Sequence, residues 1–338
     1  MRKYLLPEGK NTYKANLHCH TTMSDGQMSP EFMKKVYMEQ GYSIIAYTDH
    51  EVLFPQNHLT DESFLALNGV EYAVFEKTDI FDKTGKQIHF CAIALDENNH
   101  RTHFFSEDHF MGGNVKSNLA LMTAAEGTRG FKREYTPDRI NEMLRILKED
   151  GFFLTYNHPA WSLEDATVYS QYRGFDAAEI FNFGTYMIGF DSHASEAYDF
   201  MLKKGGCRYC LATDDNHHSL DHERVDCFGG FTVIFADSLT YPAIADALKK
   251  GDFYASTGPE IKALWLEDNI LHVECSDAKY IQLGTGNRRA GVVESKNGVL
   301  LTSADFEVVP DKDGYVRVTV WDENGRFAHS NAHFFEKD

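Results

Sequence analysis

The sequence predicts an α/β protein with a mainly parallel sheet, most simply a β/α barrel, followed by a smaller all-β segment. Up to about residue 257, short apolar runs of strand length alternate with amphipathic stretches of helical period, which is the pattern of βα units. From residue 258 onward the helical pattern stops, and strand-like runs separated by turns remain. A doubly wound open sheet is the alternative to a barrel for the first part.

Seven or eight apolar runs in the first part have the length and composition of strands. The run at residues 43–47 is apolar without alternation, which indicates burial on both faces of a sheet. We expect strands at residues 15–19, 43–47, 69–75, 87–95, 152–156, 177–181, 208–213 and 231–235.

The stretches between these strands carry helix start and stop signals. Ser29 is a suitable N-cap, Pro30 fits the first helical turn, and Gly41 ends the helix that follows. The same signals frame a helix over residues 136–151. Further helices are expected over residues 192–204 and 240–250.

Two segments interrupt the alternation. Residues 97–135 show no clear strand period, and so long an irregular insert is typical of a lid, a binding loop or a disordered segment. Residues 258–338 contain strand-like runs at 261–266, 270–275, 280–283 and 315–320. We therefore expect one domain over residues 1–257 and a small β-sandwich-like domain over residues 258–338.

The composition excludes several kinds of partner. The net charge of −18 disfavours binding to nucleic acid and to anionic membranes. Residues 1–10 hold no apolar run typical of a signal peptide, and no later window is long and apolar enough for a membrane span. The six cysteines lack the spacing of a disulfide framework. We expect a cytoplasmic protein.

Histidines and carboxylates gather where the expected strands end. His18 and His20 stand two residues apart, so a strand would point both imidazoles to the same side. Because the carboxyl ends of parallel strands meet at one mouth of a barrel, the donors at other strand ends should join them. These donors exceed the needs of one tetrahedral zinc and predict a cluster of two or three divalent metal ions. They are Asp25, His50, Glu71, His158, Asp215 and His217.

Six motifs stand in a fixed order along the chain: H-C-H-T-T-M-S-D-G, T-D-H, N-G-V-E, the lone histidine of Q-I-H-F, N-H-P and T-D-D-N-H. In this order they resemble the motifs of the PHP (polymerase and histidinol phosphatase) superfamily of metal-dependent phosphoesterases. The resemblance covers roughly residues 14–256. It implies a distorted seven-stranded, TIM-like β/α barrel and a trinuclear site for zinc, manganese or iron.

The resemblance also implies which residues bind each metal ion. The first ion would be held by His18, His20, Glu71 and Asp215; the second by Glu71, His89 and His158; and the third by Asp25, His50 and His217. Asp215 is preferred to its neighbour Asp214 because it stands two residues before His217. Asp49 is expected beside a ligand histidine, where it could orient the ring.

The activity that the resemblance implies is hydrolysis of a phosphate ester by a metal-bridged hydroxide, with a small phosphorylated metabolite or nucleotide as substrate. Glu71, Asp215 and His217 are the candidate catalytic residues at the metals. Arg224 follows the last motif and is the first candidate for binding the phosphate. Further candidates for substrate contact are Lys132, Arg133, Arg173, His218 and His222.

Three other readings remain open. An amidohydrolase-type barrel also begins with H-x-H, but it would be expected to use a metal-bridging lysine, and no expected strand ends in lysine. A non-catalytic metal-bearing module that binds a ligand or glycan through its β domain is a second alternative, which the complete ligand set argues against. Nuclease action on DNA is disfavoured by the net charge of −18 and the lack of a basic tract.

Overall fold

The computed structural model describes residues 2–79, 82–107 and 112–335 and has a mixed α/β architecture. Its described strands form three sheets, of 14, 4 and 2 strands. The predicted α/β class is therefore confirmed.

The strands expected in the first part are present, with small shifts in their bounds. They are β2 (Asn11–Asn16), β3 (Ile44–Tyr47), β4 (Leu65–Phe75), β5 (Gln87–Ala94), β8 (Phe152–Tyr156), β9 (Ala177–Asn182), β10 (Tyr209–Thr213), β11 (Phe231–Ala236) and the additional β12 (Phe253–Ser256). The first strand ends at Asn16, so His18 and His20 lie beyond it. There the backbone bonds to the segment after β10: the Asp215 N–H donates to the His18 carbonyl at 3.0 Å.

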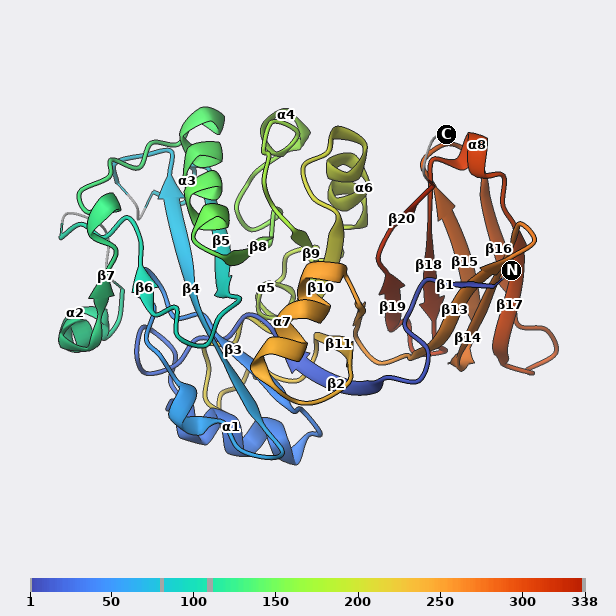
Figure 1. Ribbon diagram of the computed structural model, residues 1–338, viewed down its shortest axis with the longest axis horizontal. Coiled ribbons are helices and arrows are strands. Elements are labelled where there is room, and N and C mark those ends of the chain that lie inside the picture. The colour runs from blue at the N-terminus through green and yellow to red at the C-terminus, as the bar shows by residue number, and fades with distance from the viewer. Residues whose placement is uncertain (1, 80–81, 108–111, 336–338) are drawn as a thin grey trace.

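The longer helices lie close to their predicted bounds. They are α1 (Pro30–Glu39), α3 (Pro137–Glu149), α6 (Ser195–Lys204) and α7 (Tyr241–Lys250). The Ser29 hydroxyl accepts from the Phe32 N–H, and the Thr136 hydroxyl accepts from the Arg139 N–H. Figure 1 shows α3 and α6 along one side of the strands and α1 on the opposite side. Short helices and 3₁₀ turns are α2 (Val115–Asn118), α4 (Ala166–Tyr169), α5 (Phe183–Met187), α8 (Pro310–Asp313), η1 (Asn57–Leu59), η2 (Leu119–Leu121) and η3 (Glu126–Thr128).

The sheet is less parallel than the sequence pattern predicts. β2, β3 and β4 pair in parallel, as do β8, β9 and β10, but β5 runs antiparallel to both β4 and β8. Residues 76–86 join β4 to β5, and the described residues among them, 76–79 and 82–86, form no helix; a short connection of this kind returns the chain antiparallel. The amino end of β5 therefore lies at the same mouth as the carboxyl ends of the neighbouring strands.

The two ends of the path from β2 to β10 approach each other at this mouth. Cys19 and Asn216 form an isolated parallel bridge, and the His20 N–H donates to the Asn216 carbonyl at 3.3 Å. The first and last motifs of the sequence therefore lie side by side. A closed seven-stranded barrel stays a prediction.

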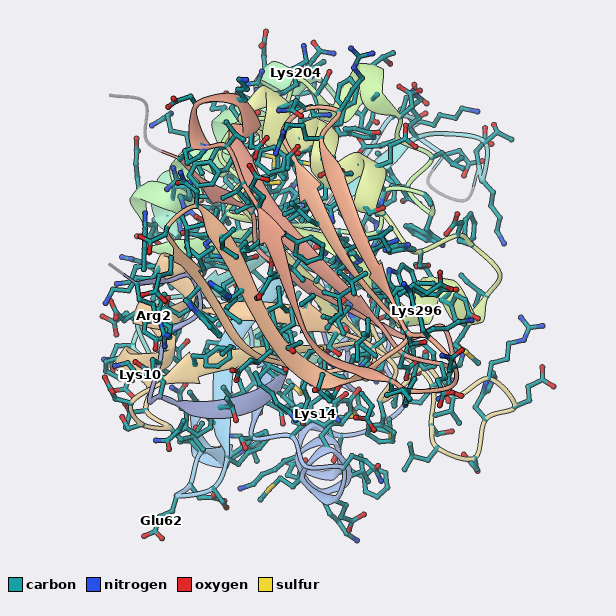
Figure 2. The ribbon with its side chains drawn as sticks, turned by 90° about the vertical axis from the view of Figure 1, so that its right-hand side faces the viewer. Arg2, Lys10, Lys14, Glu62, Lys204 and Lys296 are labelled. Atoms are coloured by element: carbon teal, nitrogen blue, oxygen red, sulfur yellow. The ribbon has the colours of Figure 1, made fainter. Side chains whose placement is uncertain are left out.

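The strands after residue 258 continue the large sheet and build the smaller one. They are β13 (Ile261–Glu267), β14 (Ile270–Ala278), β15 (Tyr280–Thr285), β16 (Ala290–Glu294), β17 (Leu301–Glu307), β18 (Tyr315–Trp321), β19 (Phe327–Ser330) and β20 (His333–Phe334), and the N-terminal β1 (Lys3–Tyr4) pairs with β13. With these bounds, the 14-stranded sheet has the order β10-β9-β8-β5-β4-β3-β2-β11-β12-β19-β18-β15-β16, with β20 paired to β18, and the 4-stranded sheet has the order β1-β13-β14-β17. Leu264, Leu271, Ile281 and Val318 form part of the buried core that these C-terminal strands share. Figure 2, in which the right-hand side of Figure 1 faces the viewer, shows these strands in front of the α/β part. A separate domain over residues 258–338 stays a prediction.

The expected insert at residues 97–135 folds against the mouth, and its residues 108–111 lie outside the described part. It contains β6 (Arg101–Thr102) and β7 (Thr123–Ala124) together with α2, η2 and η3. Arg133 anchors the end of the insert: its guanidinium lies 2.5 Å from the Glu51 carboxylate, and both side chains are nearly buried, with exposed fractions of 5% and 6%. Among the residues described, no helix has the length and apolar character needed to cross a bilayer.

Replacing Arg133 with Met should lower the free energy of unfolding by about 3–5 kcal/mol, because the Glu51 carboxylate would be left buried without its counter-ion. Denaturant unfolding followed by circular dichroism measures this change. Arg129→Met is the matched control, because Arg129 forms an exposed pair with Glu126, and such a pair contributes less than about 1 kcal/mol. The double variant Glu51→Gln/Arg133→Met should recover part of the loss. Equal stability of Arg133→Met and the control would contradict the expectation.

Candidate metal centre

The side chains predicted to bind metal gather at the mouth where the strand ends converge. Donor atoms lie within 4.8 Å of one another in three groups, each of which could hold a metal ion. The groups are His18, His20, Glu71 and Asp215; His50, Glu71 and His89; and His20, Asp25, His50 and His217. His20, His50 and Glu71 each belong to two groups, so the three groups form one continuous cluster.

The first group is fully enclosed. The Nε2 atoms of His18 and His20 both lie 3.1 Å from Asp215 Oδ1 and 3.0 Å from each other. The two oxygens of Glu71 lie 3.2 Å and 3.3 Å from the same two nitrogens. Two imidazoles and two carboxylates therefore point at one common position.

The second group surrounds the other side of Glu71. His89 Nδ1 lies 3.4 Å from Glu71 Oε1, and His50 Nδ1 lies 3.2 Å from Oε2. His158 was predicted here in place of His50. Its Nε2 lies 3.4 Å from Glu71 Oε1 and 3.7 Å from Asp215 Oδ2, so it borders both enclosed groups.

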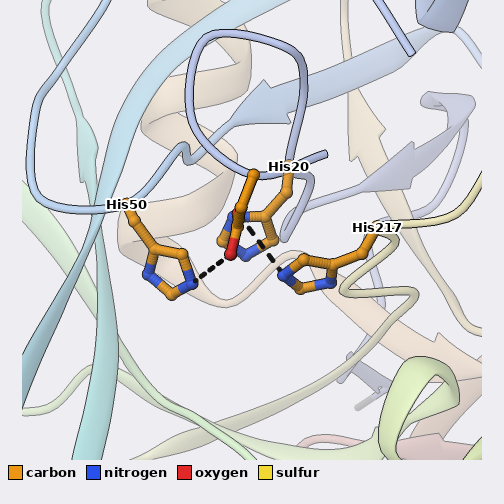
Figure 3. Close-up of side chains that lie close together, drawn as sticks. His20, His50 and His217 are labelled. Atoms are coloured by element: carbon orange, nitrogen blue, oxygen red, sulfur yellow. Dashed lines mark ion pairs between the residues drawn. The ribbon is translucent and has the colours of Figure 1, made fainter. Parts of the chain in front are cut away.

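The third group opens toward solvent. Asp25 lies 3.6 Å from ring nitrogens of His20, His50 and His217. Figure 3 shows the three imidazoles turned toward one another, with ion pairs as dashed lines. The rings of His20 and His217 stack with centroids 4.2 Å apart. Asp25, on the loop after β2, thus reaches a second position, as the sequence predicts.

The donor chemistry of the cluster fits divalent cations. His18 Nδ1 lies 2.7 Å from Glu179 Oε1, and a carboxylate only accepts, so Nδ1 carries the proton. The Nε2 lone pair of the neutral ring then points at the carboxylates of Glu71 and Asp215. A positive charge is needed there, and a metal ion can accept several of these lone pairs at once, whereas a proton cannot. Imidazole and carboxylate donors suit zinc, manganese and iron.

Unpartnered polar atoms point to the same requirement. Within the described residues, His20 Nδ1, His89 Nε2 and Asp215 Oδ1 are buried without a hydrogen-bond partner. Buried polar atoms in native proteins are almost always paired. Three exceptions in one cluster indicate that the cluster is built for ligation.

The charges of the cluster lower the pKa values of two of its carboxyl groups and raise the pKa of one of its histidines. Burial alone would raise the pKa of Glu71, but the imidazoles of His18, His89 and His50 hold it well below its usual value. Burial also opposes ionisation of Asp25, yet its three histidine neighbours bring its pKa to about 2. Conversely, burial alone would lower the pKa of His20, but nearby carboxylates raise it well above 6.5. The cluster therefore attracts positive charge.

Glu179 on β9 is a supporting residue that the motifs do not include. Besides His18 Nδ1, it accepts from the His158 N–H at 2.9 Å and from the Thr213 hydroxyl at 2.6 Å. It thereby fixes one ligand ring and the backbone of another candidate ligand. The available sequence signal is a lone carboxylate in the apolar run A-A-E-I-F.

The two aspartates beside the motif residues take structural roles. Asp49 accepts from Thr21 and Ser24, so its hydrogen bonds hold the loop that carries Asp25 rather than orienting a histidine. Asp214 accepts from the Tyr37 hydroxyl and from backbone N–H groups of residues 228–230, and burial raises its pKa to about 6. The structure thus places Asp215, and not Asp214, in the cluster.

A cavity of about 760 Å³ leads to the cluster. Arg224, predicted to bind phosphate, is exposed and is not among the residues that line this cavity. Arg173 and Lys132 also lie outside it, and Arg133 is held behind it by Glu51. The cations that do line it are Lys77, Lys83 and Lys86, from the connection between β4 and β5, together with the predicted His218. The sequence signal for the lysines is their position between the Glu71 and His89 motifs.

Comparisons with known proteins add three structural likenesses. A two-domain protein from Bacteroides vulgatus, described as containing a predicted PHP-like metal-dependent phosphoesterase, is 15% identical with 98% of each chain covered and a TM-score of 0.46. A protein from Bifidobacterium adolescentis, provisionally described as a metal-dependent phosphoesterase, is 14% identical over 62% of this chain and 91% of that one, with a TM-score of 0.38. An amidohydrolase from Chromobacterium violaceum, with bound sulfate and no metal, is 13% identical over 71% and 96%, with a TM-score of 0.38.

No family model and no curated protein matches the sequence. The assignment of the site therefore rests on its own side chains.

Replacing Glu179 with Ala should weaken metal binding by about 10- to 100-fold, the usual cost of losing a residue that orients a ligand histidine. Competition against a fluorescent chelator measures the affinity for Mn²⁺ and Zn²⁺. Glu179→Gln should fall between, because it keeps an acceptor but loses the charge. Glu196→Ala, on the first turn of α6, is the matched control. Unchanged affinity in a folded Glu179→Ala protein would contradict this role.

Metal binding should release protons and should strengthen as the pH rises from about 6 to 8. In the metal-free protein the pKa values of His18 and His20 lie well above 6.5 despite burial, because of Asp215 and Glu71. Protonation of these two histidines stabilises the metal-free fold fully at a pH below their pKa in the unfolded chain, near 6.5. This stabilisation is lost as the pH rises through their raised pKa values in the folded protein. The difference in melting temperature between loaded and metal-free protein should therefore widen with pH.

Calorimetric titration in buffers of different ionisation enthalpy counts the released protons directly. A binding enthalpy that does not depend on the buffer would contradict the expectation. His50 gives an internal comparison, because burial lowers its pKa to about 3 and its ring is therefore already neutral over this pH range.

Proposed function

We propose that this protein is a metal-dependent phosphoesterase that hydrolyses a phosphate ester of a small molecule at a cluster of two to three divalent ions of zinc, manganese or iron. The observation that carries the proposal is the sharing of donors between groups. Glu71 belongs to both the first and the second group, and His20 and His50 link those two groups to the third. Shared donors hold metal ions close together, which is the arrangement of multi-metal hydrolases.

In this proposal the nine donors divide as the motifs suggest, although His50 rather than His158 groups with Glu71 and His89 in the structure. His18, His20, Glu71 and Asp215 would hold one ion; Glu71, His89 and His158 a second; and Asp25, His50 and His217 a third. When bound, such ions lower the pKa of water and neutralise the oxygens of a phosphoryl group. Asn157 supports the shared carboxylate by donating to Glu71 Oε1 at 2.7 Å.

The chain's own cations attract an anionic substrate to this position. The net charge of −18 opposes any phosphate ester at long range. Lys77 and Lys86 pair with Asp82 and Asp165, and in the described part of the chain Lys83 has no recorded ion pair. We assign to these lysines, rather than to the exposed Arg224, the local positive charge at the cavity mouth.

His218 is a candidate for substrate contact beside the open group. It lines the cavity, and its Nδ1 lies 2.7 Å from Asp226 Oδ2. Asp226 also accepts from the N–H of His217 at 2.8 Å. Because this carboxylate holds Nδ1, the ring is oriented with Nε2 left to bond to an oxygen of the substrate.

The proposal includes the barrel and the domain division. The seven strands from β10 to β2 follow one another in the sheet, and the Cys19–Asn216 bridge joins the two ends of that path. These contacts support a distorted seven-stranded barrel over residues 1–257. The buried core shared by strands after residue 258 supports a β domain over residues 258–338.

A screen of phosphorylated metabolites and an aryl phosphate with Mn²⁺-loaded protein tests the function. Asp215→Asn and His18→Ala should each lower kcat/KM by more than about 100-fold, beyond the effect of losing a supporting residue. His272→Ala is the control, since this histidine lies on β14 and pairs with Asp305. Activity that survives both site variants would refute the mechanism. Hydrolysis of amides without hydrolysis of phosphate esters would favour the amidohydrolase alternative.

A further inference from the structure

The cavity beside the metal centre has apolar walls from three strand ends. Phe75 ends β4, Trp161 and Leu163 follow β8, and Ile188 and Phe190 follow α5. The Trp161 ring lies in edge-to-face contact with His89 and His158, at centroid distances of 5.1 Å and 5.0 Å. A group attached to a phosphate at the cluster would therefore meet these walls.

The segment that carries Trp161 and Leu163 is fixed at both ends. At its start, the His158 N–H donates to Glu179 at 2.9 Å. At its end, Glu164 is nearly buried, and its carboxylate accepts from the hydroxyls of Tyr135, Tyr156 and Tyr172. So firm an anchor is what a preorganised binding surface needs.

Leu163 adopts a costly conformation within this segment. Its φ is +57°, in the left-handed region that branched side chains avoid, and 43% of the side chain is exposed. Ile188, across the same cavity, is 44% exposed. Backbone strain and apolar exposure that coincide at a cavity point to a binding role.

Several polar side chains that line the cavity already have partners. The Thr185 hydroxyl bonds to Ser192 and to the Asn182 carbonyl. Lys77 and Lys86 are paired with carboxylates. Lys83 and Gln87 also line the cavity and can meet polar groups of a ligand, but the apolar walls themselves offer no hydrogen bond. Polar groups of a sugar or amino acid that packed against those walls would stay unpaired, which disfavours binding there.

We propose that Trp161 and Leu163 form a platform for the leaving group, and that the preferred substrates are phosphate esters of alcohols bearing a planar aromatic or other broad apolar group. This inference rests on the proposed phosphoesterase function and narrows its substrate class. Trp161 and Leu163 are specificity-determining residues, which act on the alcohol and not on the phosphate.

The test compares 2-phenylethyl phosphate with ethyl phosphate, since both are primary alkyl esters that differ chiefly in the ring. With Mn²⁺-loaded protein, kcat/KM should favour the aromatic ester by about 10- to 100-fold, as expected for burial and stacking of one ring. Trp161→Ala should bring this ratio close to one. Trp265→Ala, which removes a tryptophan from β13 in the smaller sheet, should leave the ratio unchanged.

Leu163→Gly supplies a second readout. Glycine tolerates the left-handed backbone, so the melting temperature should hold or rise while the preference for the aromatic ester falls severalfold. A simple packing role for Leu163 predicts a lower melting temperature and an unchanged preference, and that result would overturn its part in the platform.

Binding separates a failure of this inference from a failure of the phosphoesterase proposal. Calorimetry with 3-phenylpropylphosphonate and propylphosphonate, which cannot be hydrolysed at an ester oxygen, measures the same preference without turnover. If neither ester is cleaved but the aromatic phosphonate binds about tenfold more tightly in a Trp161-dependent way, the platform stands and the phosphoesterase proposal fails. Equal binding of both phosphonates, or equal cleavage of both esters by active protein, overturns the platform.

Discussion

The buried carboxylate of Glu71 is the point on which the mouth of this sheet depends. Ring nitrogens of His18, His20, His50, His89 and His158 lie 3.2–3.4 Å from its oxygens. A carboxylate with an exposed fraction of 1% is tolerated only when opposite charge and hydrogen bonds surround it. Those partners come from the segments after β2, β3 and β8 and from the start of β5, so one carboxylate contacts side chains from four separate strands. The contacts that hold the mouth together are therefore the same contacts that form the candidate metal centre.

Much of the site could be predicted from the sequence, because a motif at a strand end indicates both where the strand ends and which side chain could bind a metal ion. His18, His20, Asp215 and His217 come together because they flank Cys19 and Asn216, which form a parallel bridge, and residues two apart in an extended segment point to the same side. His89 is different, since it lies near the start of its strand. Only the reversal of β5, which pairs antiparallel with both β4 and β8, brings that end to the mouth. A motif list does not contain this strand direction.

Contacts between distant segments explain the remaining differences. Proximity in sequence suggested Arg224, but the loop after β10 turns back so that Asp226 bonds to His217 and His218, and Arg224 is left outside. Strand patterns after residue 258 were visible, yet nothing local shows that β12 pairs with β19. β11 pairs with both β2 and β12. The sheet that contains β2, the strand before His18, therefore continues into the C-terminal strands (Figure 1). Arg317 on β18 adds a two-bond contact to Asp199 on α6.

Strain around the cavity follows one pattern. Four non-glycine residues with positive φ border it: Glu51, His158, Leu163 and Asp215. Each has a strong anchor beside it, namely the Arg133 ion pair, the Glu179 carboxylate, the three tyrosine hydroxyls on Glu164, and the His18 carbonyl that accepts from the Asp215 N–H. Unfavourable dihedrals persist only where surrounding contacts over-determine them. The anchors at His158 and Asp215 lie within the candidate metal centre, whereas those at Glu51 and Leu163 lie along the walls of the cavity. The same structural device thus shapes the metal centre and the surface that we assign to the leaving group.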